Sequence, residues 1–209
     1  MTWDLDAYAR MLEAASDYSF VHFDHEPRSG EIFLRHDVDL MLEAAVRLAE
    51  VEAEHDVSAT YFLMTRSVFY NLDSHEGEDA LERLRELGHR VALHAVHPHV
   101  DRDDRFDPVL AWHNPEPEYV NEPVDGFVNV MTPPWFDRDH YRSDSNQHFR
   151  SGDPTEALAR CEFEWLQLLI HPEIWVYEGE RMRETMESML DAERELRLRQ
   201  LADDRIDLS

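Results

Sequence analysis

The stretch IFLRHDVDLMLEAAVRLAEVEAEH, residues 32–55, decides the fold of this 209-residue chain. Residues 32–35 predict a strand that runs directly into the polar segment at 36–39. Residues 40–55 predict an amphipathic helix, because small and apolar residues recur at helical spacing on one face while acids occupy the other. These apolar positions are Met41, Ala44, Ala45, Leu48 and Ala49.

The alternation of apolar strands and helices continues outward from this stretch. Further strands are expected at 18–23, 59–64, 90–93, 108–112, 127–131, around 141 and at 165–170. Further helices are expected at 3–16, at 78–87 and, as a long charged C-terminal helix, from about 178 to 200. Near-continuously apolar strands that alternate with helices favour a parallel sheet covered on both faces. We expect an α/β barrel or an incomplete one with about seven strands. No linker divides the chain, so residues 1–209 are interpreted as one domain.

The composition excludes several classes of protein. The chain has 46 acids against 20 basic residues, all of them arginine, for a formal net charge of −26. Such a chain would be repelled by nucleic acid and by an anionic membrane surface. The absence of lysine rules out Schiff-base chemistry. Cys161 is the only cysteine, and we see neither a signal peptide nor a long apolar span, so we expect a cytoplasmic protein.

Polar residues that can bind a metal fall where successive apolar strands end. They are Asp37 and Asp39, His94, His113 and His171. In an α/β barrel these ends meet at one rim, which carries the active site. Asp37 and Asp39 are two residues apart, so in an extended chain their side chains point the same way while His36 points to the opposite face. Two carboxylates held together repel each other unless a cation neutralises them.

Each of these positions also has a simpler interpretation. The two aspartates could be solvated loop acids, and His113 could be a histidine at the edge of the core. His94, His97 and His99 could be a chance cluster among 13 histidines. Asp144 fits an Asx turn in the segment SDSN. We expect the remaining histidines to lie mostly at the surface or in caps, namely His22, His25, His55, His75, His89, His140 and His148.

Several segments, taken in order, resemble the polysaccharide deacetylase superfamily, the NodB-homology or carbohydrate esterase family 4 group. They are LRHDVD (34–39), ATYF (59–62), GHRVALH (88–94), WHNP (112–115), YRSDS (141–145) and LIHPE (169–173). The chain is most similar to the branch whose first motif is His-Asp-Val-Asp. The resemblance covers about residues 31–175 and implies a distorted, incomplete (β/α) barrel.

The resemblance also implies a metal site and a reaction. A divalent ion, zinc first with nickel, cobalt, manganese or iron as alternatives, would be held by one aspartate and two histidines. By position, Asp39 and His94 would be ligands, Asp37 the general base and His171 the general acid, although the two aspartates could exchange roles. The usual His-x-x-x-His spacing places Pro98 at the second histidine. Proline cannot bind a metal, so the third ligand would be His113, His97 or His99. The branch that the chain resembles tends to place its second histidine in a His-x-Pro segment, and this similarity favours His113.

The sequence thus predicts a metal-dependent hydrolase that removes an acetyl or formyl group from the nitrogen of a sugar or a similar amine. Asp144 and Arg142 would orient the residues of the site from behind or bind substrate. The expected partner is a small molecule or a carbohydrate, not nucleic acid or a membrane. The alternative is a deacetylase-like binding or partner-assembly protein without catalytic activity. Hydrolysis of a C–N bond outside carbohydrates is a third interpretation.

Overall fold

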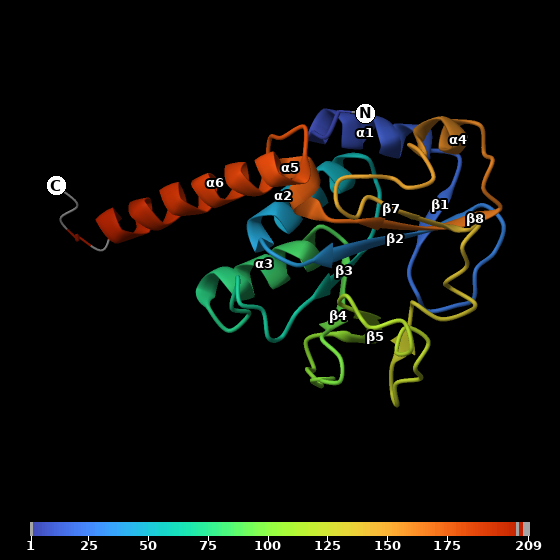
Figure 1. Ribbon diagram of the computed structural model, residues 1–209, viewed down its shortest axis with the longest axis horizontal. Coiled ribbons are helices and arrows are strands. Elements are labelled where there is room, and N and C mark those ends of the chain that lie inside the picture. The colour runs from blue at the N-terminus through green and yellow to red at the C-terminus, as the bar shows by residue number, and fades with distance from the viewer. Residues whose placement is uncertain (1, 204, 207–209) are drawn as a thin grey trace.

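A parallel sheet forms the centre of the computed structural model, which describes residues 2–203 and 205–206 (Figure 1). Its strands are β1 (Ser19–Val21), β2 (Glu31–Val38), β3 (Thr60–Leu63), β4 (Arg90–Ala95), β5 (Asp107–Trp112), β6 (Val128–Asn129), β7 (Tyr141–Ser143) and β8 (Trp165–Ile170). Seven of them follow the order β6-β5-β4-β3-β2-β8-β7, and β1 pairs beside the start of β2. The sheet curls into a half-barrel, so the expected fold class, a distorted and incomplete (β/α) barrel of about seven strands, is confirmed.

The described part of the chain contains six helices. They are α1 (Leu5–Ala14), α2 (Leu42–Glu54), α3 (His75–Glu86), α4 (Thr155–Ala159), α5 (Pro172–Val176) and α6 (Met182–Asp203). The helices α1 and α3 begin at side-chain caps, since Asp4 and Ser74 each accept a hydrogen bond from a backbone N–H of the first turn. Helix α6 extends beyond the rest of the molecule in Figure 1.

The alternation of side chains along β2 separates the core from the site. Ile32, Leu34 and Val38 point to the outer face and pack in the main core with α1, α2 and α5. Phe33 points to the inner face, where it packs in a second cluster with residues of β3, β4 and β5. Residues two apart on a strand share a face, so Arg35 and Asp37 lie on this inner face as well.

Several strands extend further than the sequence predicted. Strand β2 continues through Val38 and β4 through Ala95, so Asp37 and His94 lie within the last residues of their strands instead of after them. The expected strand at 127–131 shortens to two residues. The short helices α4 and α5 were not predicted, because each has only five residues and shows no full helical repeat.

Two expectations about polar residues are wrong. Glu52 was placed with the acids on the solvent side of its helix, and His89 among the surface histidines, but both are buried. Glu52 accepts hydrogen bonds from Tyr61 and Tyr8 and pairs with His36 Nε2 at 2.6 Å. His89 lies 3.5 Å from the same carboxylate. This buried network joins α2 to the outer face of the sheet, and a buried charge is tolerated there because it is paired.

No helix in the described residues combines the length and the apolar character that crossing a bilayer requires.

Candidate metal site

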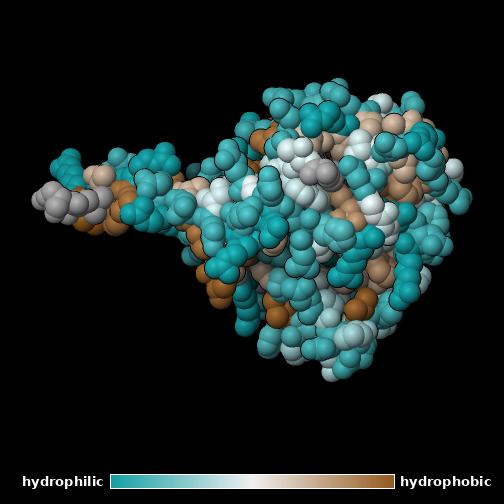
Figure 2. Space-filling model, turned by 45° about the horizontal axis from the view of Figure 1, so that its top comes forward, coloured by the Kyte–Doolittle hydropathy of each residue, from teal (hydrophilic) through white to brown (hydrophobic). Residues whose placement is uncertain are grey.

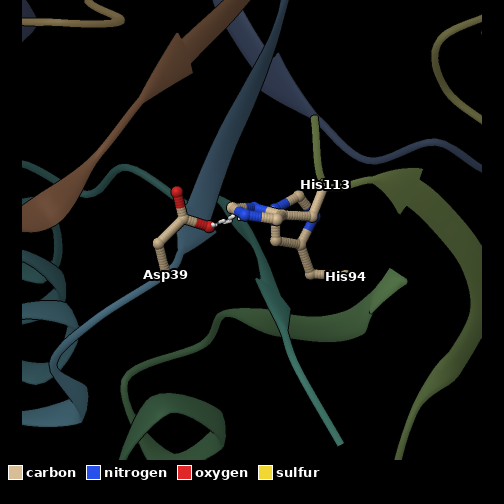
Figure 3. Close-up of side chains that lie close together, drawn as sticks. All are labelled: Asp39, His94 and His113. Atoms are coloured by element: carbon tan, nitrogen blue, oxygen red, sulfur yellow. Dashed lines mark hydrogen bonds and ion pairs between the residues drawn. The ribbon is translucent and has the colours of Figure 1, made fainter. Parts of the chain in front are cut away.

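Three side chains from three segments converge at the carboxyl end of the sheet (Figure 3). Asp39 follows β2, His94 lies in β4 and His113 follows β5. Asp39 Oδ1 lies 3.1 Å from His94 Nε2 and 3.0 Å from His113 Nδ1, and the two ring nitrogens are 3.2 Å apart. Each residue therefore offers one ligand atom to the same point.

The backbone fixes the orientation of the His94 ring. Its Nδ1–H donates a hydrogen bond to the carbonyl oxygen of Ala111 on the neighbouring strand, at 3.1 Å. In its neutral form, His94 then presents the lone pair of Nε2 to the lone pairs of the Asp39 carboxylate. These repel each other unless a metal ion, or a proton on Nε2, lies between them. Histidines that bind metals usually donate their other ring N–H to a carbonyl or a carboxylate in this way.

The charges of the cluster fit a cation as well. Burial alone would raise the pKa of Asp39, but hydrogen bonds from His113 and His94 hold that pKa below its usual range. The hydrogen bond with Asp39 raises the pKa of His113. Two nitrogens and one oxygen are ligands that Zn²⁺ accepts, and three protein ligands leave a position open for water or substrate. The donor set therefore fits a divalent metal ion.

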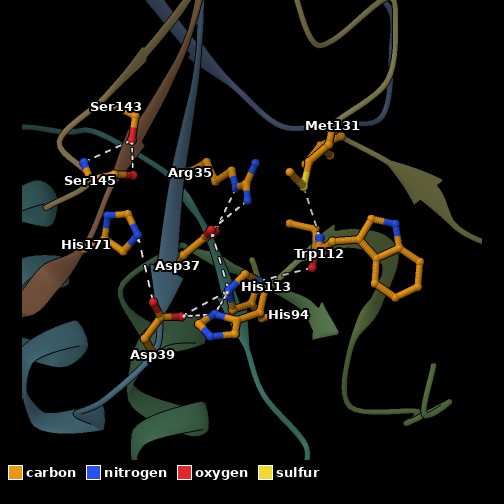
Figure 4. Close-up of polar contacts among 12 residues, drawn as sticks. Arg35, Asp37, Asp39, His94, Trp112, His113, Met131, Ser143, Ser145 and His171 are labelled. Atoms are coloured by element: carbon orange, nitrogen blue, oxygen red, sulfur yellow. Dashed lines mark hydrogen bonds and ion pairs between the residues drawn. The ribbon is translucent and has the colours of Figure 1, made fainter. Parts of the chain in front are cut away.

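Asp37 lies beside the triad but is held by Arg35 (Figure 4). The guanidinium donates from Nε to Oδ1 at 2.7 Å and from Nη2 to Oδ2 at 2.6 Å. Asp37 Oδ2 also lies 3.6 Å from His94 Nε2. Burial alone would raise the pKa of Asp37, but the charge of Arg35 holds it below its usual range. Asp37 is therefore an ionised carboxylate at neutral pH, oriented toward the cluster.

His171 approaches the cluster from the opposite side (Figure 4). Its Nδ1 donates to Asp144 Oδ1 at 2.6 Å, and its Nε2 lies 4.0 Å from Asp39 Oδ2. Asp144 is fully buried and also accepts from the backbone N–H of His171 and from Trp175 Nε1. Burial alone would lower the pKa of His171, but the charge of Asp144 raises it to about 10. A protonated imidazolium thus faces the site at neutral pH.

The other residues singled out from the sequence lie elsewhere. Arg142 donates to the backbone carbonyls of Asp139 and Tyr141 and stacks over the ring of Phe163. Of the two residues expected to support the site, only Asp144 does so, through its hydrogen bond with His171. His97 pairs with Glu122 at 3.0 Å and stacks on Tyr119. His99 lines a separate small cavity beside Asp101 and is not in the triad.

Sequence reasoning missed two residues that shape this site. Arg35 was assigned only to a strand, although its position two residues before Asp37 places it on the same face. Glu173 was quoted only as part of a motif. It is buried, its Oε2 has no hydrogen-bond partner within residues 2–203 and 205–206, and burial raises its pKa to about 7. A carboxyl group in an apolar environment gives no signal in the sequence that would reveal it.

A cleft of about 420 Å³ opens beside the triad. Asp39, His113, His171 and Glu173 line its floor with polar atoms. Its rim includes Val68, which is 90% exposed. The rest of the wall is mixed, since it contains apolar side chains together with Arg66, Ser67, Asn114, Ser145 and Asn146. The cleft is large enough for a small molecule.

Fold and site together define an α/β half-barrel with an Asp-His-His cluster, a flanking carboxylate and a flanking imidazolium at the carboxyl edge of its sheet. Comparisons with family models, with curated proteins and with solved structures give no match for this chain. The chemistry of the site is therefore argued from its own geometry.

Proposed function

We propose that this chain is a metal-dependent hydrolase that removes an N-acyl group, acetyl or formyl, from a sugar or a similar acylated amine. The observation that carries the proposal is the convergence of Asp39, His94 and His113 on one point, each with one ligand atom. Asp37 and His171 flank that point, the first as a carboxylate that can accept a proton and the second as an imidazolium that can donate one. The order of its motifs supports membership of the polysaccharide deacetylase superfamily.

The roles of the residues follow from their protonation. When bound, a divalent ion would polarise the acyl carbonyl and acidify a water. Asp37, kept ionised by Arg35, would accept the proton of that water as it attacks. His171, kept protonated by Asp144, would donate a proton from Nε2 to the departing nitrogen. Breaking an amide bond needs this last proton, because an amide anion is a very poor leaving group.

The cleft supports a small polar substrate with an acyl group. Hydroxyl groups of a sugar can bond with Asn114, Ser145 and Asn146, all of which line the cleft. Apolar atoms of Val68 and Ile174 can contact a methyl group.

The exposed Cys161 has no disulfide, which supports a reducing compartment such as the cytoplasm.

A specific observation favours the alternative, a binding protein without catalytic activity. Both carboxylate oxygens of Asp37 accept a hydrogen bond from Arg35, and this pairing makes Asp37 a weaker base. If the base were too weak, the site would keep its metal and bind acylated sugars without cleaving them.

Metal content and turnover distinguish the two proposals. Protein purified without added ions should contain about one divalent ion per chain, and adding Zn²⁺ to the chelated protein should raise its Tm. Wild type should release acetate or formate from at least one member of a panel of N-acyl sugars, and Asp37→Asn should not. Asp24→Asn is a matched control, because Asp24 is an exposed aspartate that pairs with His25 away from the site. Absence of a bound ion together with an unchanged Tm would contradict the metal site. Bound metal with equal inactivity of both proteins would favour the binding protein.

A further inference from the structure

Exposed apolar side chains gather at the mouth of the cleft beside the metal site. Val68 is 90% exposed, and Phe69 and Val96 are each 44% exposed. All three line the cleft whose floor contains Asp39 and His113, and we call them the apolar rim. Among the described residues, the other strongly exposed large apolar side chains lie on α6 or just beyond it, namely Leu190, Leu201 and Ile206.

The apolar rim differs from the surface around it. The face of the molecule in Figure 2 is mostly hydrophilic, and apolar side chains show there only in small areas. Single exposed apolar residues are common on soluble proteins, but several together beside a cleft mark a binding site. The rim and the cleft are continuous, which indicates that one ligand occupies both.

The loop that presents Val68 and Phe69 is fixed on both sides. It connects β3 to α3. Before these two residues, Arg66 donates two hydrogen bonds to Asp101, in the segment that follows β4, at 2.6 and 2.9 Å. After them, Tyr70 donates to the last carbonyl oxygen of β2, at 2.7 Å. The exposed side chains are therefore held in place, and a ligand would not have to order the loop in order to bind.

The cleft has walls of two kinds. The apolar rim follows the neighbouring strands β3 and β4. The polar side chains Asn114, Ser145 and Asn146 follow β5 and β7. A ligand that fills the cleft therefore needs polar groups for one wall and an apolar group for the rim. The methyl group of an acetyl is too small to cover three exposed side chains, so this apolar group is a further part of the ligand.

We propose that the apolar rim binds an alkyl or aromatic group that the substrate carries in addition to its acylated amine. On a sugar, this group would be an apolar aglycone. The proposal rests on the proposed function, because it names a further part of the substrate of that site. The acyl group would lie at the triad, and the apolar group would leave water against Val68, Phe69 and Val96. The rim would thus strengthen binding without touching the reacting atoms.

Alkyl glycosides of glucosamine test the proposal, because they have the form of reaction products and contain no acyl group to cleave. Calorimetry with the Zn²⁺-loaded full chain measures the Kd of the methyl and of the hexyl glycoside, both below the concentrations at which they form micelles. The hexyl glycoside should bind about tenfold more tightly, since each methylene group that leaves water strengthens binding by about two- to fourfold. Acetate release from the N-acetyl forms of both glycosides tests the hydrolase separately.

Two sets of substitutions show where the hexyl group binds. The double variant Val68→Ser, Val96→Ser should lower the ratio of the two Kd values to about two or less, because it removes most of the apolar surface of the rim. Leu190→Ser is a matched control, since Leu190 is 51% exposed on α6 and is not among the residues that line the cleft. It should leave the ratio unchanged. All three positions are exposed, so these variants should keep the fold.

Equal Kd values for the two glycosides in wild type would overturn the proposal. A preference for the hexyl glycoside that the double variant keeps would also overturn it. Equal Kd values together with a dimer that the double variant dissociates would assign the rim to a second copy of this chain instead. Tighter hexyl binding that the double variant abolishes, without acetate release from the N-acetyl forms, would contradict the hydrolase and support the proposed role of the rim.

Discussion

Arg35 and Asp37, two residues apart on the inner face of β2, form a buried ion pair with two hydrogen bonds, of 2.7 and 2.6 Å. The side chains are only 1% and 6% exposed, so water does little to screen the pair. Arg35 Nη1 also donates to Gln167 on the neighbouring strand β8. The pair therefore both orients Asp37 beside the metal-ligand cluster and joins two strands of the sheet.

We predict that removing the arginine destabilises the protein strongly. Arg35→Gln leaves the Asp37 carboxylate buried without its partner, which should lower the free energy of unfolding by about 3–5 kcal/mol at pH 7. Urea unfolding measures this loss. The ion pair holds the pKa of Asp37 below its usual range. Its contribution to the free energy of unfolding is therefore complete at pH values above the usual aspartate pKa, and it is lost as the pH falls through the lowered pKa.

Arg66 offers a matched control for this prediction. It also makes two hydrogen bonds to one aspartate, Asp101, but its side chain is 68% exposed. Arg66→Gln should therefore lower the free energy of unfolding by about 1 kcal/mol or less. Equal losses for the two variants would mean that the burial of the Arg35 pair has no energetic consequence.

A second prediction concerns the third metal ligand. His113→Ala should weaken Zn²⁺ binding by about 100-fold or more, since even residues behind the ligands often affect affinity by 10- to 100-fold. His97→Ala should leave the affinity unchanged, because His97 pairs with Glu122 and stacks on Tyr119 instead. Competition with a chromophoric chelator measures both values. Comparable losses in the two variants would contradict the assignment of His113.

The third prediction concerns the protonation of His171. The pKa of its imidazole should be about 10 in the metal-free protein, and NMR titration of the ring protons measures it. Asp144→Asn removes the charge that raises this value and should lower the pKa by about 1 to 3. Because the pKa of His171 is raised, the His171–Asp144 pair stabilises the fold fully at pH values below the ordinary histidine pKa of 6.5. This contribution is lost as the pH rises toward 10. A wild-type pKa near 6.5 would contradict the proposed effect of Asp144 on His171.

Local patterns were enough to predict the fold class and to show that polar residues gather where the strands end. Strand and helix follow from apolar spacing within one segment, and the alternation along a strand placed Asp37 and Asp39 on one face and His36 on the other. The partners of these residues could not be predicted in the same way. Glu52 occupies a position on α2 where an acid normally faces water, and only the packing of His36, Tyr8 and Tyr61 against it makes that position buried. Contacts between distant segments leave no periodic signal in either segment.

The last prediction concerns Glu173, whose carboxyl group is buried and whose Oε2 has no hydrogen-bond partner in the described residues. Burial raises its pKa from 4.5 to about 7 in the folded chain. Between these values the folded state binds more protons than the unfolded state, so this group makes the protein less stable as the pH rises from 4.5 to 7. The resulting penalty above pH 7 is about 3 kcal/mol.

Glu173→Gln should remove that penalty, because the amide has the same shape and no charge. The variant should therefore raise the Tm of the metal-free protein at pH 8 and change it little at pH 4.5, which calorimetry at the two pH values measures. Glu178→Gln, at an exposed position on the segment that follows α5, should change the Tm little at either pH. A lower Tm for Glu173→Gln at pH 8 would mean that the ionised carboxylate stabilises the fold. If the variant is more stable but binds substrate less well, Glu173 contributes to substrate binding in the cleft, and the protein keeps it although it lowers the stability of the fold.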